Sequence, residues 1–262
     1  MNAIQVTILA CLLIFISTVL GSSLVYVIRR KLSAKVSNIV LGFASGIMVS
    51  AGIFGLLIPA MEEAEVLYQE LAILPVVIGF VLGGIFLNLL DKVVPHFHNE
   101  RNEEEGPKSG LAKQLKFFLS VMIHNIPEGL AVGFACGLAL QTNDPGAIAG
   151  VLALAIGISI QNFPEGLAIS VPMYEQTGNK NKSFLYGVLS GVVEPLFAVV
   201  GIFLASLFEP LLPWLLAFSA GAMIYVTIEE LLPAARKENH EHYGLWAFMI
   251  GFIVMLSLEI LL

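Results

Sequence analysis

Two six-residue segments of this chain repeat the same pattern of side chains that can bind a metal ion. The first reads His124-Asn125-Ile126-Pro127-Glu128-Gly129, and the second reads Gln161-Asn162-Phe163-Pro164-Glu165-Gly166. In a helix, residues three and four apart lie on one face, so the ligand-type side chains of each segment stand together. If the two faces meet, imidazole nitrogen and carboxylate oxygens converge on one point, and amide and carboxylate oxygens converge one turn away. A set of nitrogen and oxygen ligands suits zinc, iron(II), manganese, cobalt or cadmium.

Five glutamates lie inside long apolar runs, where a charge is costly: Glu128, Glu165, Glu194, Glu229 and Glu230. An ionisable group at bilayer depth costs at least ~2.5–3.5 kcal/mol and normally faces a partner, a cavity or an ion path. The apolar runs that hold these glutamates contain no Lys or Arg. A cation from outside the chain is therefore the simplest partner for them.

Other residues in the apolar runs admit two interpretations each. Glu194 precedes Pro195, which again combines a carboxylate with a helix breaker, and we favour Glu194 as a ligand. Glu229 and Glu230 form either a station where the metal leaves or an acidic cap at the membrane interface. Met48 either supplies a thioether ligand or packs against its neighbours, and packing is the commoner role of Met in an apolar helix.

Histidines also occur in two polar connections. His96 and His98 lie in the segment 93–116, which we expect to be a cytoplasmic loop rich in His and acidic residues within a single transmembrane domain spanning 1–262. His240 and His242 lie in a later connection. Such tracts can bind metal weakly, but they are also common in solvated loops, and we prefer the second interpretation.

The elements that must position these residues are membrane-spanning helices. Hydrophobic residues make up 57% of the 262 residues and charged residues 13%, with a mean hydropathy of +0.87. A soluble domain carries roughly 25% charged residues. The net charge of −7 argues against nucleic acid as a partner and is compatible with cations.

Eight apolar runs are each long enough to cross a bilayer as a helix, at about Ile4–Ile28, Val36–Pro59, Ala72–Leu90, Phe117–Leu140, Ala147–Val171, Phe184–Phe208, Leu211–Leu232 and Tyr243–Leu262.

The basic residues predict the orientation of these spans. All 13 Lys and Arg fall in alternate connections: Arg29, Arg30, Lys31, Lys35, Lys92, Arg101, Lys108, Lys113, Lys116, Lys180, Lys182, Arg236 and Lys237. Because basic residues accumulate in cytoplasmic loops, we expect both termini outside. We expect the protein in the cell membrane, that is, the plasma or inner membrane, with the lipid bilayer as its surroundings.

The chain also contains an inverted repeat. The second span holds Ser45-Gly46-Ile47-Met48 and the seventh holds Ala220-Gly221-Ala222-Met223, and each ends in a similar Leu/Ile-Pro-Ala sequence. The fourth and fifth spans hold the two ligand segments. Both pairs run in opposite directions through the membrane, and inverted repeats are typical of secondary transporters. Pro127 and Pro164 each remove a helical hydrogen bond, so we expect kinked backbone there.

These motifs resemble the signature of the ZIP (Zrt/Irt-like) metal transporters, and the resemblance covers essentially the whole chain. It implies an all-α fold of eight transmembrane helices in a 3+2+3 arrangement, and transport of divalent metal toward the cytoplasm through a binuclear site. By the resemblance, the first metal position uses His124, Glu128, Gln161 and Glu165, with Met48 in the matching place of the second span. The second uses Asn125, Glu128, Asn162, Glu165 and Glu194. Many members have His where this chain has Gln161, and this departure resembles the GufA-like branch, which also includes proteins of the ZupT type.

We therefore expect a transporter of divalent transition metals, with zinc first and iron, manganese, cadmium or cobalt also considered. The metal ion is the substrate, and we expect no organic cofactor. An intramembrane metal-dependent enzyme is one alternative, although no His-Glu-x-x-His sequence occurs. A metal-selective channel is another, since the same ligands can line a pore. The sequence leaves the assembly open, with a homodimer as the candidate.

Overall fold

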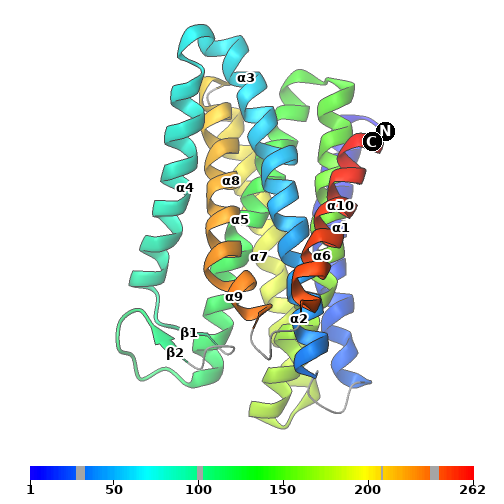
Figure 1. Cartoon of the computed structure of the whole chain (residues 1–262), viewed down its shortest axis with the longest axis vertical. Helices are drawn as coiled ribbons and strands as arrows, with labels where there is room; N and C mark the ends of the chain where they lie inside the picture. The colour runs from blue at the N-terminus through cyan, green and yellow to red at the C-terminus, as the bar shows by residue number, and fades with distance from the viewer. Residues whose placement is uncertain (28–32, 99–102, 208, 237–241) are drawn as a thin grey trace.

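The fold is a bundle of long helices. The computed structural model describes residues 1–27, 33–98, 103–207, 209–236 and 242–262. Within these ranges eight helices are long and apolar enough to cross a membrane, as predicted: Ala3–Tyr26, Ala34–Leu71, Ile73–Val93, Gln114–Thr142, Pro145–Thr177, Lys180–Leu207, Leu212–Ala234 and Tyr243–Leu261. Both chain termini lie at one end of the bundle, and a short two-stranded sheet lies at the other (Figure 1).

Several spans are built from more than one helical segment. The first is α1 (Ala3–Ser23) with η1 (Leu24–Tyr26), and the second is α2 (Ala34–Ser50), the π-helical η2 (Ala51–Leu57), α3 (Ile58–Tyr68) and η3 (Gln69–Leu71). The next four are α4 (Ile73–Val93), α5 (Lys113–Thr142), α6 (Pro145–Thr177) and α7 (Lys180–Leu207). The seventh is α8 (Leu212–Val226), the π-helical η5 (Thr227–Leu231) and α9 (Leu232–Ala234), preceded by η4 (Glu209–Leu211), and the eighth is α10 (Tyr243–Leu261). Strands β1 (His96–His98) and β2 (Glu103–Glu105) pair antiparallel.

The prediction that the second span ends at Pro59 is wrong. The helix runs on to Tyr68, so Glu62, Glu63 and Glu65 lie on α3. Pro59 is tolerated because it occupies the first turn of α3, where its missing N–H costs no hydrogen bond. This turn directly follows the π-helical turns of η2. By contrast, Pro127, Pro164 and Pro195 lie inside α5, α6 and α7, which continue through them as helices.

A short turn brings the two ligand-bearing helices side by side. Asn143 ends α5 in the left-handed conformation with φ 50°, and the Asp144 side chain accepts a hydrogen bond from the Ala147 N–H at the start of α6. Pro145 takes the first helical position, where its fixed φ suits the helix. The helices are therefore antiparallel neighbours, and the segments at 124–129 and 161–166 lie at comparable depth.

Four glycines reveal the inverted repeat in the packing. A Cβ on Gly46 would collide with the Phe248 carbonyl, and one on Gly251 with the Phe43 carbonyl, which brings α2 and α10 into backbone contact. The pair α4 and α8 repeats this arrangement, with Gly83 against the Phe218 carbonyl and Gly221 against that of Phe80. All four helices carry the same Phe-x-x-Gly spacing. Small residues permit such close approach between membrane helices, and the repeat thus includes α4 and α10 as well as the second and seventh spans.

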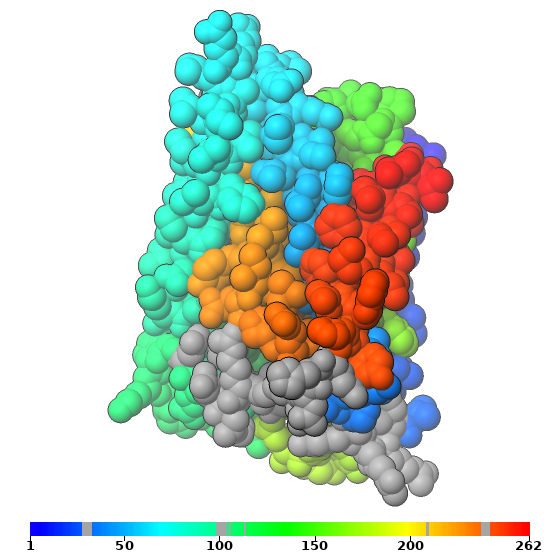
Figure 2. Space-filling view, in the orientation of Figure 1, coloured from blue at the N-terminus to red at the C-terminus, as the bar shows by residue number. Residues whose placement is uncertain are grey.

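The outer surface of the bundle is apolar. On α1 the exposed large side chains recur every four residues, at Ile4, Ile8, Leu12, Ile16 and Leu20. Figure 2 shows another flank, with α4 at one side, α3 and α8 between, and α10 at the other. The exposed large apolar residues of α4 and α10 include Val81 and Ile253. Apolar residues outside and polar residues inside are the arrangement expected of helices surrounded by lipid.

Candidate metal centre

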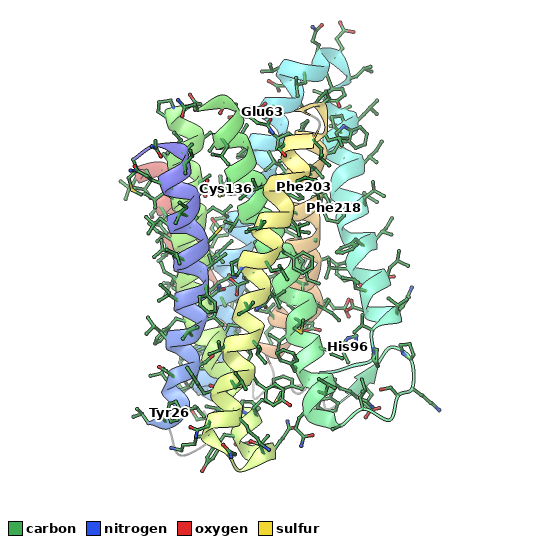
Figure 3. All side chains as sticks on the ribbon, turned by 180° about the vertical axis from the view of Figure 1, so that it is seen from behind. Tyr26, Glu63, His96, Cys136, Phe203 and Phe218 are labelled. Atoms are coloured by element: carbon green, nitrogen blue, oxygen red, sulfur yellow. The ribbon has the colours of Figure 1, made fainter. Side chains whose placement is uncertain are left out.

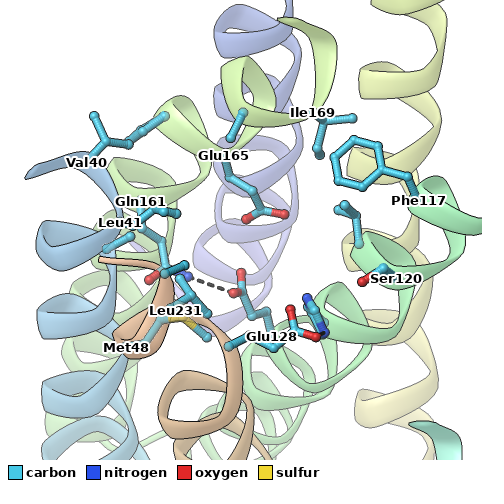
Figure 4. Close-up of a pocket in the computed structure, with 17 residues that line it drawn as sticks. Val40, Leu41, Met48, Phe117, Ser120, Glu128, Gln161, Glu165, Ile169 and Leu231 are labelled. Atoms are coloured by element: carbon cyan, nitrogen blue, oxygen red, sulfur yellow. Dashed lines mark hydrogen bonds and ion pairs between the residues drawn. The ribbon is translucent and has the colours of Figure 1, made fainter. Parts of the chain in front are cut away.

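The two repeated segments meet at one pocket inside the bundle. Gln161 Nε2 on α6 donates a 2.8 Å hydrogen bond to Glu128 Oε1 on α5, so the two ligand faces are in direct contact (Figure 4). His124 and Glu165 line the same pocket, and Met48 reaches it from α2. The five side chains that the resemblance assigns to the first metal position therefore line a common cavity.

This pocket extends toward the end of the bundle that carries β1 and β2. Its remaining walls are Val40, Leu41, Ala44, Phe117, Ser120, Val121, Pro164, Ala168, Ile169, Glu230, Leu231 and Ala234. Most belong to α2, the early part of α5 and the late part of α6, and Glu230, Leu231 and Ala234 belong to η5 and α9; these segments lie toward that end (Figure 1). Toward the other end the interior is filled by fully buried apolar side chains, including Leu56, Leu154, Ile158, Leu216 and Met223. The bundle is thus hollow on one side of the ligands and packed on the other.

The adjacent residues Glu229 and Glu230 point into different spaces. Glu230 Oε1 lies 3.0 Å from His124 Nε2, inside the ligand pocket. Glu229 lines a second, polar pocket with Asn88, Asp91 and Lys92 of α4 and Tyr225 of α8. The two glutamates diverge because neighbouring residues of a helix project about 100° apart. Of the two interpretations left open by the sequence, a simple acidic cap does not describe Glu230.

Glu194 is the centre of a second, fully buried group. Its side chain is 0% exposed, Asn162 Nδ2 donates a short hydrogen bond to Oε2, and Asn125 Nδ2 donates one of 3.3 Å to Oε1. Thr18 of α1 also donates to Oε1, at 3.2 Å. Sequence reasoning missed Thr18, because a hydroxyl in an apolar span usually bonds its own helix, as Thr18 also does with the Ile14 carbonyl. Three of the five residues predicted for the second metal position, Asn125, Asn162 and Glu194, are therefore in contact, with Thr18 as an unforeseen neighbour.

Oxygen atoms suited to a metal ion remain unpartnered in this region. Within the described part of the chain, five buried oxygens of the predicted ligands accept no hydrogen bond: Asn125 Oδ1, Glu128 Oε2, Gln161 Oε1, Asn162 Oδ1 and Glu165 Oε1. A buried polar atom without a partner costs about 1–3 kcal/mol, so such a cluster needs a physical reason. Binding of cations that accept oxygen ligands would give such atoms partners.

Side-chain amides are necessary to this donor set. Among the residues that the structure describes, no three His, Cys, Asp or Glu side chains converge as a group able to hold a metal ion. Asn125, Gln161 and Asn162 would have to complete the coordination. Their nitrogens donate to carboxylates here, as with Gln161 and Glu128, so binding a cation requires each amide oxygen to turn inward. Amide and carboxylate oxygens together with one imidazole fit a borderline divalent ion.

The predicted solvated loop is not solvated at His96. This side chain is 0% exposed, its Nδ1 lies 2.8 Å from the Val94 carbonyl, and its Nε2 lies 3.7 Å from Asp91 Oδ1. Burial follows from the strand pairing, which folds the loop back against the start of α5. Figure 3 shows His96 at the same end of the bundle as Tyr26 and opposite Glu63. His242 is exposed at the start of α10.

Some predictions fall on residues outside the structural description. They are the side chains of His98 and Lys113, together with His240 and five of the basic residues used for the orientation, Arg29, Arg30, Lys31, Arg101 and Lys237.

A sixth intramembrane carboxylate, Glu259 of α10, was not among the predicted sites. Its Oε1 is buried without a hydrogen-bond partner and lies where a side chain on Gly55 of η2 would project. The repeat could have revealed it. Glu259 follows Gly251 by eight residues, and Asp91 follows the repeat-related Gly83 by the same interval. Asp91 and Glu259 are therefore equivalent carboxylates near opposite ends of the bundle.

Comparison with known proteins places the chain among metal transporters. A model of the family described as ZIP zinc transporter matches residues 4–116 and 103–259. The chain is similar to "Zinc transporter ZIP11" of Homo sapiens, with 33% identity over 324 residues, covering 93% of this chain and 93% of the relative. It is 34% identical over 252 residues to "Zinc transporter GufA" of Myxococcus xanthus, covering 95% and 96%. It is also 34% identical over 253 residues to "Zinc transporter ZupT" of Chlorobium chlorochromatii (strain CaD3), covering 92% and 91%.

Proposed function

This chain belongs to the ZIP zinc transporter family, and from that premise we propose that its buried pocket carries divalent transition metals toward the cytoplasm. The protein is a multi-pass membrane transporter of zinc, and membership of a transporter family sets aside an intramembrane enzyme. Iron, manganese, cadmium and cobalt are further candidate substrates, because the ligands combine imidazole, carboxylate and amide groups.

The observation that carries the proposal is the set of ligand side chains gathered around one pocket, with carboxylate oxygens that have no hydrogen-bond partner. The first metal position consists of His124, Glu128, Gln161 and Glu165, which line the pocket with Met48. Two of these side chains keep a carboxylate oxygen without a hydrogen-bond partner, Oε2 of Glu128 and Oε1 of Glu165. Two carboxylates give the site enough negative charge to balance a dication that has left water.

The second metal position consists of Asn125, Asn162 and Glu194, and shares Glu128 and Glu165 with the first. Glu194 already accepts hydrogen bonds from both asparagines, so the three side chains are within reach of one another. Here every donor to the metal is oxygen. We expect this position to hold borderline metals less tightly than the position that contains imidazole.

Carboxylates beyond these two positions suggest the path. Glu259 near the end with the termini is suited to meet the ion outside, and Glu230 beside His124 to receive it on the cytoplasmic side. Asp91 and Glu229 line an adjoining polar pocket further along α4 and α8. In this proposal the termini are outside and the open end of the ligand pocket is cytoplasmic. The packed outer half favours a carrier over a channel, since a channel needs a continuous pore.

Uptake into proteoliposomes tests the proposal. Purified protein should move radioactive zinc in a saturable manner, and Glu128→Ala should remove this uptake while Glu62→Ala, an exposed glutamate of α3, should retain it. Unchanged uptake by folded Glu128→Ala protein contradicts the proposed site. Single-channel currents would favour a pore.

Cysteine labelling tests the orientation separately. In a background with Cys11 and Cys136 replaced by Ala, cysteines at Lys108 and Asp144 should react with an impermeant reagent from opposite faces. Reaction of both from one face contradicts the orientation of the termini.

A further inference from the structure

A buried hydroxyl lies between two methionines that the inverted repeat relates. Thr227, the first residue of η5, is 0% exposed. Its Oγ1 lies 2.7 Å from the Met223 carbonyl and 3.6 Å from Met48 Sδ, both within hydrogen-bond reach. Both methionines are buried, and Met48 lines the metal pocket. Thr227 therefore contacts the sulfur of a predicted ligand from behind the pocket wall.

The hydroxyl has one proton for two acceptors. When it donates to Met48 Sδ, it occupies a lone pair that the thioether would otherwise offer to a metal ion. When it donates to the Met223 carbonyl alone, the sulfur is released at the cost of one hydrogen bond to sulfur, and the buried donor still has a partner. The Thr227 hydroxyl thus competes with a metal ion for the Met48 sulfur, and a sufficiently soft metal can displace the hydroxyl.

The equivalent position in the other repeat has no hydroxyl. Thr227 follows Met223 by four residues, and Gly52 follows Met48 by the same four. A Cβ at Gly52 would meet the Ile224 side chain at 3.4 Å, an ordinary packing distance, so space alone does not forbid a larger residue there. Of these two repeat-related positions, Thr227 carries a hydroxyl and Gly52 does not.

From these contacts we propose that Thr227 is a positioning residue that sets metal preference by competing for the Met48 thioether. The inference rests on the proposed function, in which Met48 is a ligand. Loss of the hydroxyl leaves the sulfur free, and soft ions such as cadmium gain relative to manganese, which prefers oxygen ligands.

Competitive uptake of cadmium and manganese tests this inference. Thr227→Val keeps the shape of the side chain and removes the hydroxyl, and should raise the cadmium-to-manganese uptake ratio about fivefold, the factor expected for one hydrogen bond of about 1 kcal/mol. Thr227→Ser keeps the hydroxyl and should retain the parent ratio within about twofold. Thr227→Ala provides a second hydroxyl-free variant and should shift the ratio in the same direction.

A second background separates this role from a merely structural one. In Met48→Leu protein, which has no thioether, Thr227→Val should leave the ratio unchanged. An equal shift in both backgrounds overturns the inference, as does an unchanged ratio in Thr227→Val and Thr227→Ala proteins that retain transport. A parent protein that moves none of the metals instead contradicts the proposed function itself.

Discussion

The ligands at the pocket and the group around Glu194 differ mainly in the hydrogen bonds that their carboxylates already accept. At the pocket, His124 and Glu230 are partly exposed, at 15% and 17% of their side chains, and ligand atoms face an open space. Around Glu194 the side chains are fully buried and joined by hydrogen bonds from Asn125, Asn162 and Thr18. The first group can be reached through the open end of the pocket. An ion can enter the second only by breaking hydrogen bonds, so we expect the first group to dominate transport and the second to adjust it.

The strongest test of this comparison removes the carboxylates that both positions share. Glu128→Ala or Glu165→Ala leaves one shared carboxylate to balance two dications, and each charged contact contributes about 1.5–3 kcal/mol. We expect zinc uptake in proteoliposomes to fall about a hundredfold or more. Glu63→Ala on α3 is the matched control. Substantial zinc uptake by either folded variant would contradict the proposal that Glu128 and Glu165 serve both metal positions.

His124→Ala comes next in expected effect. It removes the one nitrogen ligand of the pocket and the partner of Glu230, so the KM for zinc should rise about tenfold or more. Binding of zinc to the purified protein should weaken in parallel. His242→Ala, at an exposed histidine, should behave like the parent. If both histidine variants change equally, the pocket has no special role.

Glu194→Ala should have an intermediate effect. Zinc uptake should fall only about threefold to tenfold, with an altered order of preference among metals, because the imidazole-containing position remains. Bound metal in the purified protein, measured by mass spectrometry, should fall from two ions toward one. A variant that loses all transport while binding two ions would reverse the ranking of the two groups.

Thr18→Val should have a smaller effect. It removes one of three donors to the Glu194 carboxylate and leaves the pocket ligands in place. We expect a loss of about 1.5 kcal/mol in stability and a change of no more than about threefold in zinc uptake. Thermal unfolding and uptake measured on the same preparation check both values. Abolished uptake with unchanged stability would mean that Thr18 belongs to the transport path.

The loop histidines should matter least. Replacement of His98, His240 and His242 by Ala should leave zinc uptake within about twofold of the parent, because water competes for metal in connections outside the spans. His96 is excluded from this set, since it is buried beside Asp91. Complete loss of uptake with normal expression would place an essential site in the loops.

The sequence predicts the spans and the two ligand segments because both signals are local. Length and apolarity determine a span, and spacing determines a helix face. Pro59 misled the prediction because a proline after a π-helical segment looks the same in sequence as a proline that ends a helix. Thr18 and the different directions of Glu229 and Glu230 depend on contacts between helices distant in sequence, which one span cannot reveal. Glu259 was within reach of sequence reasoning, but only through a repeat that became clear once the glycine contacts were known.

The reciprocal glycine contacts also bear on how the chain assembles during synthesis. The partner of α2 is α10, and the partner of α4 is α8, so the earlier helix of each pair enters the membrane before its partner exists. Until α10 follows, the face of α2 at Gly46 lacks the Phe248 carbonyl against which it packs, and lipid packs less closely there. The second span can therefore complete its packing only after the last span has been synthesised. We expect a chain that ends before Tyr243 to leave this face of α2 unpacked and to be degraded by quality-control proteases.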